Sequence, residues 1–220
     1  MVEISTSILS VKEEESIKKF YDLEVAHTDY FHIDVMDGKF VANNTSQLMN
    51  EYVNQIKQIS NIPLDVHLMV SNVREYLEEY IPVNPNIITF HYEAVKNSEE
   101  IMSLINYIKE NNIKVGLSVK PDTKIEEIYE FLPYIHMVLV MTVEPGKGGQ
   151  KLIEETLNKI KQLKQYIQKN NIELDIEADG GINLETIKKV KEAGIDIAVV
   201  GSGIINTENY KETIKQLKNI

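Results

Sequence analysis

The chain has 220 residues, a hydrophobic fraction of 43% and a formal net charge of −11. This length and hydrophobic content suffice for one sizeable core, whereas the acidic balance argues against a nucleic-acid-binding protein, which needs a basic face. The sequence contains no cysteine, which excludes disulfides, thiolate nucleophiles and cysteine-based zinc sites, so any metal ion must bind His, Asp, Glu or carbonyl oxygen.

No segment predicts a membrane span or a secretory signal. The longest wholly apolar run is Met137–Met141, far shorter than the roughly 20 residues of a spanning helix. The first residues carry no basic stretch followed by a long apolar run. We therefore expect a soluble, cytoplasmic protein that associates with neither nucleic acid nor membrane.

Short β-like runs alternate with longer helical stretches along the whole chain. The predicted strands are Glu3–Ser7, Tyr30–Val35, Pro63–Leu68, Ile87–His91, Lys114–Val119, Met137–Met141, Glu173–Ala178 and Ile197–Val200. The clearest amphipathic helical stretch between them is Lys151–Asn170. Eight units in 220 residues give about 27 residues per unit, a normal size for a βα unit. Strands separated by helices pair in parallel.

Residue alternation within the strands distinguishes a barrel from an open sheet. One face of the second predicted strand carries Phe31, Ile33 and Val35, and the other carries His32 and Asp34. The third and seventh strands show the same alternation. An open sheet with helices on both faces would read as continuous apolar runs. The pattern therefore predicts a single-domain (β/α)8 TIM barrel over residues 1–220, with an open-sheet fold as the alternative.

Four potential metal ligands fall on the polar faces of these strands. His32 and Asp34 are two residues apart and point the same way, His67 lies on the polar face of the next strand, and Asp179 ends the seventh. Barrel sites lie at the carboxyl ends of the strands, and His and Asp are ligands for divalent ions. The alternative is a set of hydrogen-bonded polar residues in the core, which is costly for so many charged groups.

Glycine-rich segments follow the last three strands and favour a phosphate-binding site. They contain Gly146, Lys147, Gly148 and Gly149, then Gly180 and Gly181, and finally Gly201 and Ser202. Glycine lets the backbone approach an anion closely, and late loops build the phosphate sites of many barrels. Lys147 is interpreted either as a phosphate contact or as a solvated loop charge.

Three methionines lie near these groups, at the ends of the second, third and sixth strands. Met36, Met69 and Met141 are interpreted either as flexible core filling or as a polarisable lining of the site. His91 is interpreted as a structural histidine.

The motifs in chain order resemble the ribulose-phosphate 3-epimerase family. The matching segments are Ser7-Ile8-Leu9-Ser10, the run from His32 to Val41, Leu64 to Met69, Met141 to Gln150, Glu177 to Gly181, and Val200-Gly201-Ser202. The resemblance extends from about residue 4 to residue 205 without a missing block. Departures from the family pattern, among them Thr6, Ala42 and Lys147, remove none of the four predicted ligands.

The resemblance implies a barrel of the ribulose-phosphate-binding type that interconverts D-ribulose 5-phosphate and D-xylulose 5-phosphate. It implies that His32, Asp34, His67 and Asp179 bind one divalent metal ion, with zinc expected and iron, manganese or cobalt as alternatives. Asp34 and Asp179 are the implied acid/base pair. Ser7 and His67 are expected to contact the substrate together with Asp179, and the glycine-rich segments, including Lys147 and Ser202, are expected to surround its phosphate.

The expected mechanism moves a proton at C3 between two carboxyl groups through a metal-stabilised enediolate. The main alternative is D-allulose-6-phosphate 3-epimerase, which has the same chemistry on a hexose phosphate. A non-catalytic sugar-phosphate-binding barrel is less favoured because both acid/base candidates are present. A related lyase would carry an Asp-x-Lys-x-x-Asp motif, which is absent. The expected partner is a small ketose phosphate, and we expect a homo-oligomer.

Overall fold

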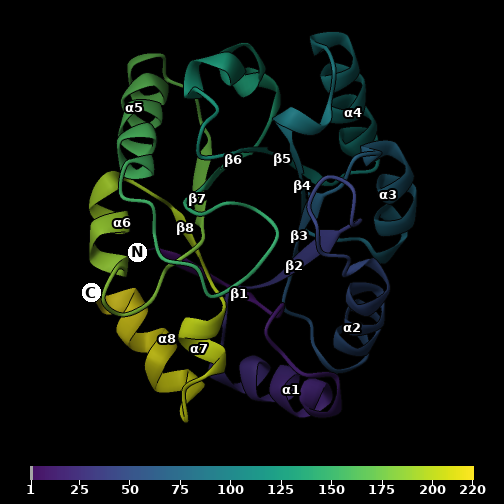
Figure 1. The fold of residues 1–220 in the computed structure, drawn as a ribbon, viewed down its shortest axis with the longest axis vertical. Coiled ribbons are helices and arrows are strands. Elements are labelled where there is room, and N and C mark those ends of the chain that lie inside the picture. Colours follow the sequence, from purple (N-terminus) through teal and green to yellow (C-terminus); the bar gives the residue numbers. More distant parts are fainter. Residues whose placement is uncertain (1) are drawn as a thin grey trace.

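The computed structural model, which describes residues 2–220, is a closed barrel of eight parallel strands in chain order (Figure 1). The strands are β1 (Glu3–Ser7), β2 (Tyr30–Met36), β3 (Leu64–Met69), β4 (Ile87–His91), β5 (Lys114–Val119), β6 (Met137–Met141), β7 (Asp175–Asp179) and β8 (Ile197–Val200). This confirms the predicted (β/α)8 TIM barrel and excludes the open sheet. Among the described residues, no helix is long and apolar enough to span a membrane.

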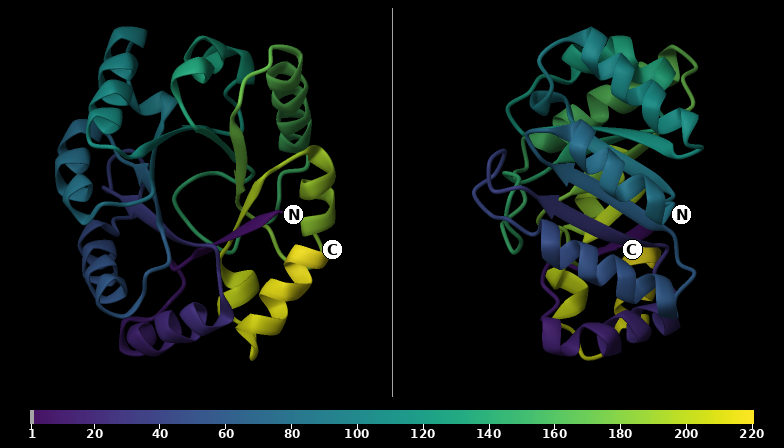
Figure 2. Two further views of the ribbon diagram at one scale, coloured as in Figure 1. Left: turned by 180° about the vertical axis from the view of Figure 1, so that it is seen from behind. Right: turned by 90° about the vertical axis from the view of Figure 1, so that its right-hand side faces the viewer.

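Helices surround the barrel and cover its outer face (Figure 2). The α-helices are α1 (Ser16–Ala26), α2 (Ser46–Ile59), α3 (Val73–Tyr80), α4 (Ser98–Glu110), α5 (Thr156–Lys169), α6 (Ile187–Ala193), α7 (Ser202–Ile205) and α8 (Tyr210–Asn219). The 3-10 helices are η1 (Glu13–Glu15), η2 (Ile81–Val83), η3 (Tyr92–Ala94) and η4 (Ile125–Tyr134). Between β5 and β6 the connection is therefore a 3-10 helix, which contains Pro133.

Alternation along each strand divides the buried residues into an outer and an inner set. Phe31, Ile33 and Val35 of β2 pack with the helices in the large outer core. A smaller apolar cluster, which includes Met137 and Leu139, comes from the opposite strand face. The remaining inward-facing positions are largely polar, as the sequence predicts.

The predicted helix over Lys151–Asn170 begins later than its apolar pattern indicates. α5 starts at Thr156, and the preceding residues 151–155 form an irregular connection that ends in a turn at Glu154 and Glu155. The backbone N–H of Ile153 donates to the carbonyl of Thr142, and the Thr156 hydroxyl donates to the carbonyl of Ile153. Tertiary contacts with the end of β6 therefore hold these residues outside the helix.

Candidate functional site

A cavity of about 460 Å³ opens at the carboxyl ends of the strands. Its size is in the range of small-molecule sites. Of the predicted site residues, those that line it are Ser7, Asp34, Met36, Met69, Met141, Gly146, Lys147, Gly148, Gly149, Asp179, Gly180, Gly181, Gly201 and Ser202. His32 and His67 are fully buried and are not among its lining residues. The structure thus brings segments from both ends of the chain to one cavity.

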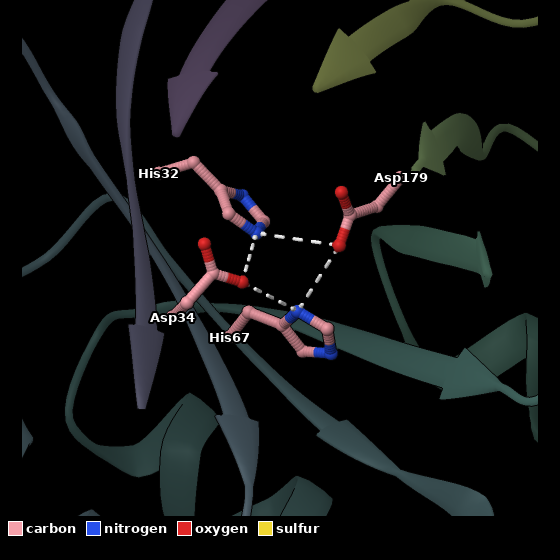
Figure 3. A group of neighbouring side chains, drawn as sticks. All are labelled: His32, Asp34, His67 and Asp179. Carbon is pink, nitrogen blue, oxygen red and sulfur yellow. Dashed lines mark ion pairs between the residues drawn. The ribbon is translucent and has the colours of Figure 1, made fainter. Parts of the chain in front are cut away.

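Strand register explains why the four predicted ligands converge. His32 and Asp34 are on the inner face of β2, and Asp34 is paired in register with His67 of β3. Asp179 is the last residue of β7 and approaches from another part of the ring (Figure 3). The four side chains offer ligand atoms that all lie within 4.8 Å of one another.

The distances between these atoms describe a compact group. Asp34 Oδ1 lies 3.4 Å from His32 Nε2 and 3.7 Å from His67 Nδ1. Asp179 Oδ2 lies 3.9 Å from His32 Nε2 and 3.6 Å from His67 Nδ1. Figure 3 shows both carboxyl groups and both rings directed at one point.

This arrangement fits a divalent metal ion. Ligands at 2.0–2.2 Å from a tetrahedral ion are separated from one another by about 3.3–3.6 Å, close to the distances observed here. His32 Nε2 and His67 Nδ1 are buried and have no hydrogen-bond partner. Buried polar atoms are normally paired, so two unpaired nitrogens that face two carboxylates are the donor set that an ion would satisfy.

Asp65 orients His32 through the ring nitrogen that faces away from the candidate metal position. The sequence alone had indicated no role for Asp65. Asp65 Oδ2 lies 2.5 Å from His32 Nδ1 and accepts a 2.8 Å hydrogen bond from the Ser5 hydroxyl. Asp65 is the in-register neighbour of His32 on β3. Glu177 of β7 is fully buried and offers a carboxyl oxygen within 4.8 Å of ligand atoms of His32 and Asp65. The available sequence signal was that Asp65 and Glu177 occupy polar-face positions on the predicted third and seventh strands.

The charges of this buried group are strongly coupled. Burial alone would lower the pKa of His32, but the carboxylates of Asp65 and Asp34 outweigh it and raise this pKa well above its ordinary value. Burial alone would raise the pKa of Asp34, but the charges and hydrogen bonds of His32 and His67 hold it far below its ordinary value. Burial, with the neighbouring charge of Asp34, raises the pKa of Asp179 to about 6. Burial, with the charge of Asp65, also raises the pKa of Glu177, which favours its neutral acid.

Ser7 and Thr45 fix the orientation of Asp34. The Ser7 hydroxyl donates to Asp34 Oδ2 over 2.6 Å, which leaves Oδ1 facing the two histidines. The Thr45 hydroxyl donates to the Asp34 carbonyl, also over 2.6 Å. The serine at the end of β1 therefore lies beside the candidate acid/base group.

The glycine-rich segments form part of the wall of the cavity. Gly181 has a φ of +69°, and a Cβ there would lie 2.3 Å from the backbone nitrogen of Leu152. Gly146 is held by its carbonyl, which accepts a 2.7 Å hydrogen bond from the Asn43 side chain. Lys147 is exposed at the cavity rim. The glycines leave backbone of this wall open to the cavity, a feature that favours anion binding.

Comparisons with known proteins show which family the chain resembles. Residues 3–205 match the model of the ribulose-phosphate 3 epimerase family. A curated protein from Bacillus subtilis named ribulose-phosphate 3-epimerase is 35% identical over 99% of both chains. Proteins of the same name from Methanocaldococcus jannaschii and Helicobacter pylori are 38% identical over 99% of this chain and 90% of the relative, and 37% identical over 89% and 88%.

Solved structures of more distant proteins share the fold. A crystal structure of 3-hexulose-6-phosphate synthase has a TM-score of 0.71 and 12% identity, and covers 99% of this chain and 98% of that chain. A crystal structure of KGPDC from Streptococcus mutans has a TM-score of 0.74 and 12% identity over 100% and 96%. At this identity the likeness concerns the barrel alone.

Proposed function

The chain belongs to the ribulose-phosphate 3-epimerase family and is an isomerase of the epimerase class, and we propose that it interconverts D-ribulose 5-phosphate and D-xylulose 5-phosphate. The observation that carries this proposal is the pair of carboxyl groups, Asp34 and Asp179, that enter one cavity from strands not adjacent in the barrel. Epimerisation needs one group to remove a proton and another to return it to the opposite face.

Asp34 and Asp179 are the proposed acid/base pair. One carboxylate removes the proton from C3, and the electron pair of the broken C–H bond moves toward the neighbouring ketone to give an enediolate. The other carboxyl group delivers its proton to C3 from the opposite face. The reverse reaction exchanges the two roles. Ser7 keeps Asp34 aimed at the cavity, and Met36, Met69 and Met141 line it.

His32, Asp34, His67 and Asp179 are the proposed ligands of one divalent metal ion, with zinc as the first candidate and iron, manganese or cobalt as alternatives. The ion would supply Lewis-acid stabilisation of the negative charge on the substrate oxygens. The carboxylates of Asp65 and Asp34 raise the pKa of His32, so binding of the ion would release a proton from this ring.

The glycine-rich segments are proposed to hold the substrate phosphate. The cavity is lined by Gly146 to Gly149, Gly180, Gly181, Gly201 and Ser202. Backbone N–H groups bind a phosphate independently of the net charge of the protein. Lys147 contributes a positive charge at the rim.

Substitution of the two carboxylates tests the mechanism. We expect Asp34→Asn and Asp179→Asn each to lower kcat by at least the 10²–10⁴-fold typical of an acid/base group. Asp175→Asn is the matched control, because Asp175 is on the same strand but at the opposite end of the barrel. Near-normal turnover in either site variant with metal bound would disprove the two-carboxylate scheme.

A parallel assay identifies the substrate. D-ribulose 5-phosphate and D-allulose 6-phosphate are offered side by side, and exchange of the C3 proton is followed in heavy water. The pentose phosphate is expected to react with the higher kcat/KM. A higher value for the hexose phosphate would transfer the proposal to the sister reaction, and no exchange with either would leave a binding protein.

A further inference from the structure

The second ring nitrogen of His67 makes a buried contact that the proposed reaction does not use. His67 Nε2 lies 2.9 Å from Nε2 of His91, the last residue of β4. The two rings are stacked with centroids 5.0 Å apart and an interplanar angle of 27°. Both are fully buried. One proton must lie between these nitrogens, because two facing lone pairs would repel each other.

Glu93 determines which histidine donates this proton. His91 Nδ1 lies 3.2 Å from Glu93 Oε2. Glu93 Oε1 accepts hydrogen bonds from the backbone N–H of Lys120, over 2.7 Å, and from the hydroxyl of Thr123. These donors favour the ionised carboxylate, which can only accept. His91 therefore donates from Nδ1 to Glu93, and its Nε2 is left as the acceptor for His67.

The chain of contacts connects the candidate metal position to the loop after β5. It passes from His67 through His91 to Glu93 in η3, and from there to Lys120 and Thr123. The side chain of Glu93 is 19% exposed, so this series of hydrogen bonds ends near the protein surface. Because the Glu93 carboxylate can only accept, the hydrogen bonds run from His67 to His91 and from His91 to Glu93.

We propose that His91 and Glu93 are positioning residues that keep the proton of His67 on Nε2 and so leave Nδ1 free as a metal ligand. This inference rests on the proposed metal site, because it assigns the partner that prepares one of its ligands. Metal-binding histidines commonly donate their other nitrogen to a carboxylate, which fixes the tautomer. For His32 that carboxylate is Asp65, in direct contact. For His67 it is Glu93, reached through the ring of His91.

The tautomer is measurable in metal-free protein by NMR of the ring nitrogens. The sequence has only five histidines, so single substitutions assign each signal. We expect His67 to be protonated on Nε2 and His91 on Nδ1. In His91→Leu we expect the His67 proton to move toward Nδ1, where Asp34 and Asp179 are the available acceptors. This readout requires neither metal nor activity.

Titration with Co²⁺, followed by its absorption spectrum, measures the effect on the site. His91→Leu should weaken Co²⁺ binding by about 10–100-fold. His91→Gln should restore most of the affinity, because its amide oxygen can accept from His67 Nε2 and its amide NH₂ can donate to Glu93. Glu93→Gln should weaken binding by about 10-fold, at the lower end of the same range. Glu110→Gln is the matched control and should leave Co²⁺ binding unchanged, because Glu110 is exposed at the end of α4 and contacts none of these residues.

The outcomes separate this inference from the proposed function. An Nδ1-protonated His67 in the metal-free wild-type protein would overturn the inference. So would an unchanged tautomer and Co²⁺ affinity in His91→Leu and Glu93→Gln variants whose far-UV circular dichroism shows an intact fold. Failure of the wild-type protein to bind Co²⁺ or to exchange the C3 proton would instead overturn the proposed function, and the tautomer measurement would still decide the inference.

Discussion

His32 and His67 each direct one ring nitrogen at the candidate metal position, and the second ring nitrogen contacts a buried side chain. His32 contacts Asp65, and His67 contacts His91. An imidazole with one nitrogen fixed in this way presents the other in a defined direction, which a freely rotating side chain does not. The precision of the site therefore depends on residues that do not line the cavity.

The hydrogen bonds to Glu93 predict how the free energy of unfolding changes at acid pH. Burial alone would raise the pKa of Glu93, but hydrogen bonds from His91, Thr123 and the backbone of Lys120 outweigh it and lower this pKa from 4.5 to about 2. The native state therefore favours the ionised form, and the resulting stability is complete above pH 4.5 and lost as the pH falls toward 2. The shift corresponds to at most about 3 kcal/mol in the free energy of unfolding.

Denaturant unfolding of wild-type and Glu93→Gln protein from about pH 7 to about pH 3 measures this contribution. The wild-type protein should be more stable at neutral pH, and the difference should shrink below pH 4.5. A difference that does not change with pH would show that the charge of Glu93 contributes nothing to stability.

At the scale of elements, the strands were predictable because the alternation of polar and apolar residues is a local sequence pattern. Alternation in β2 is a property of seven adjacent residues and identifies the inner face directly. The start of α5 was not predictable in this way, since Leu152 and Ile153 continue the apolar spacing of the helix. Their backbones instead contact Gly181 and the carbonyl of Thr142. Such contacts between distant segments leave no periodic signal.

Contacts between distant segments restricted the prediction of the site in the same way. Strand parity places His32, Asp34, His67 and Asp179 on the inner face, so the convergence of these four side chains was predictable from the sequence. The pairing of His67 with His91 depends on side-chain geometry between neighbouring strands, and the contact of Glu93 with Thr123 joins the loops after β4 and β5. The sequence therefore indicates only a structural role for His91 and carries no signal for Glu93.

The close packing of the segment after β7 predicts a specific sensitivity to a single methyl group. Gly181→Ala adds a Cβ that meets the backbone of Leu152 at a positive φ. We expect this variant to lose about 1–3 kcal/mol of stability and to show a raised KM, because the wall of the cavity must move. Gly148→Ala is the control for stability alone, because its nearest non-neighbouring atom would lie at 3.6 Å, an ordinary contact. Equal free energies of unfolding for the two variants would contradict this account.

At the scale of the whole molecule, the four proposed ligands connect strands that are far apart in the ring. His32, Asp34 and His67 belong to the neighbouring strands β2 and β3, whereas Asp179 belongs to β7. An ion bound to all four would therefore link opposite parts of the barrel mouth. Because the unfolded chain does not hold these residues together, binding energy would add to the stability of the native state.

Thermal and denaturant unfolding with and without metal tests this linkage. After treatment with a chelator, addition of Zn²⁺ or Co²⁺ at about 100 times its Kd should raise the free energy of unfolding by about 2.7 kcal/mol. Asp179→Ala should lose most of this increase, since it removes the one ligand that β7 contributes. Asp175→Ala, at the other end of the same strand, should retain it. An equal increase in wild-type and Asp179→Ala protein would place the bound ion elsewhere, because stabilisation that does not need β7 cannot come from an ion held between β2, β3 and β7.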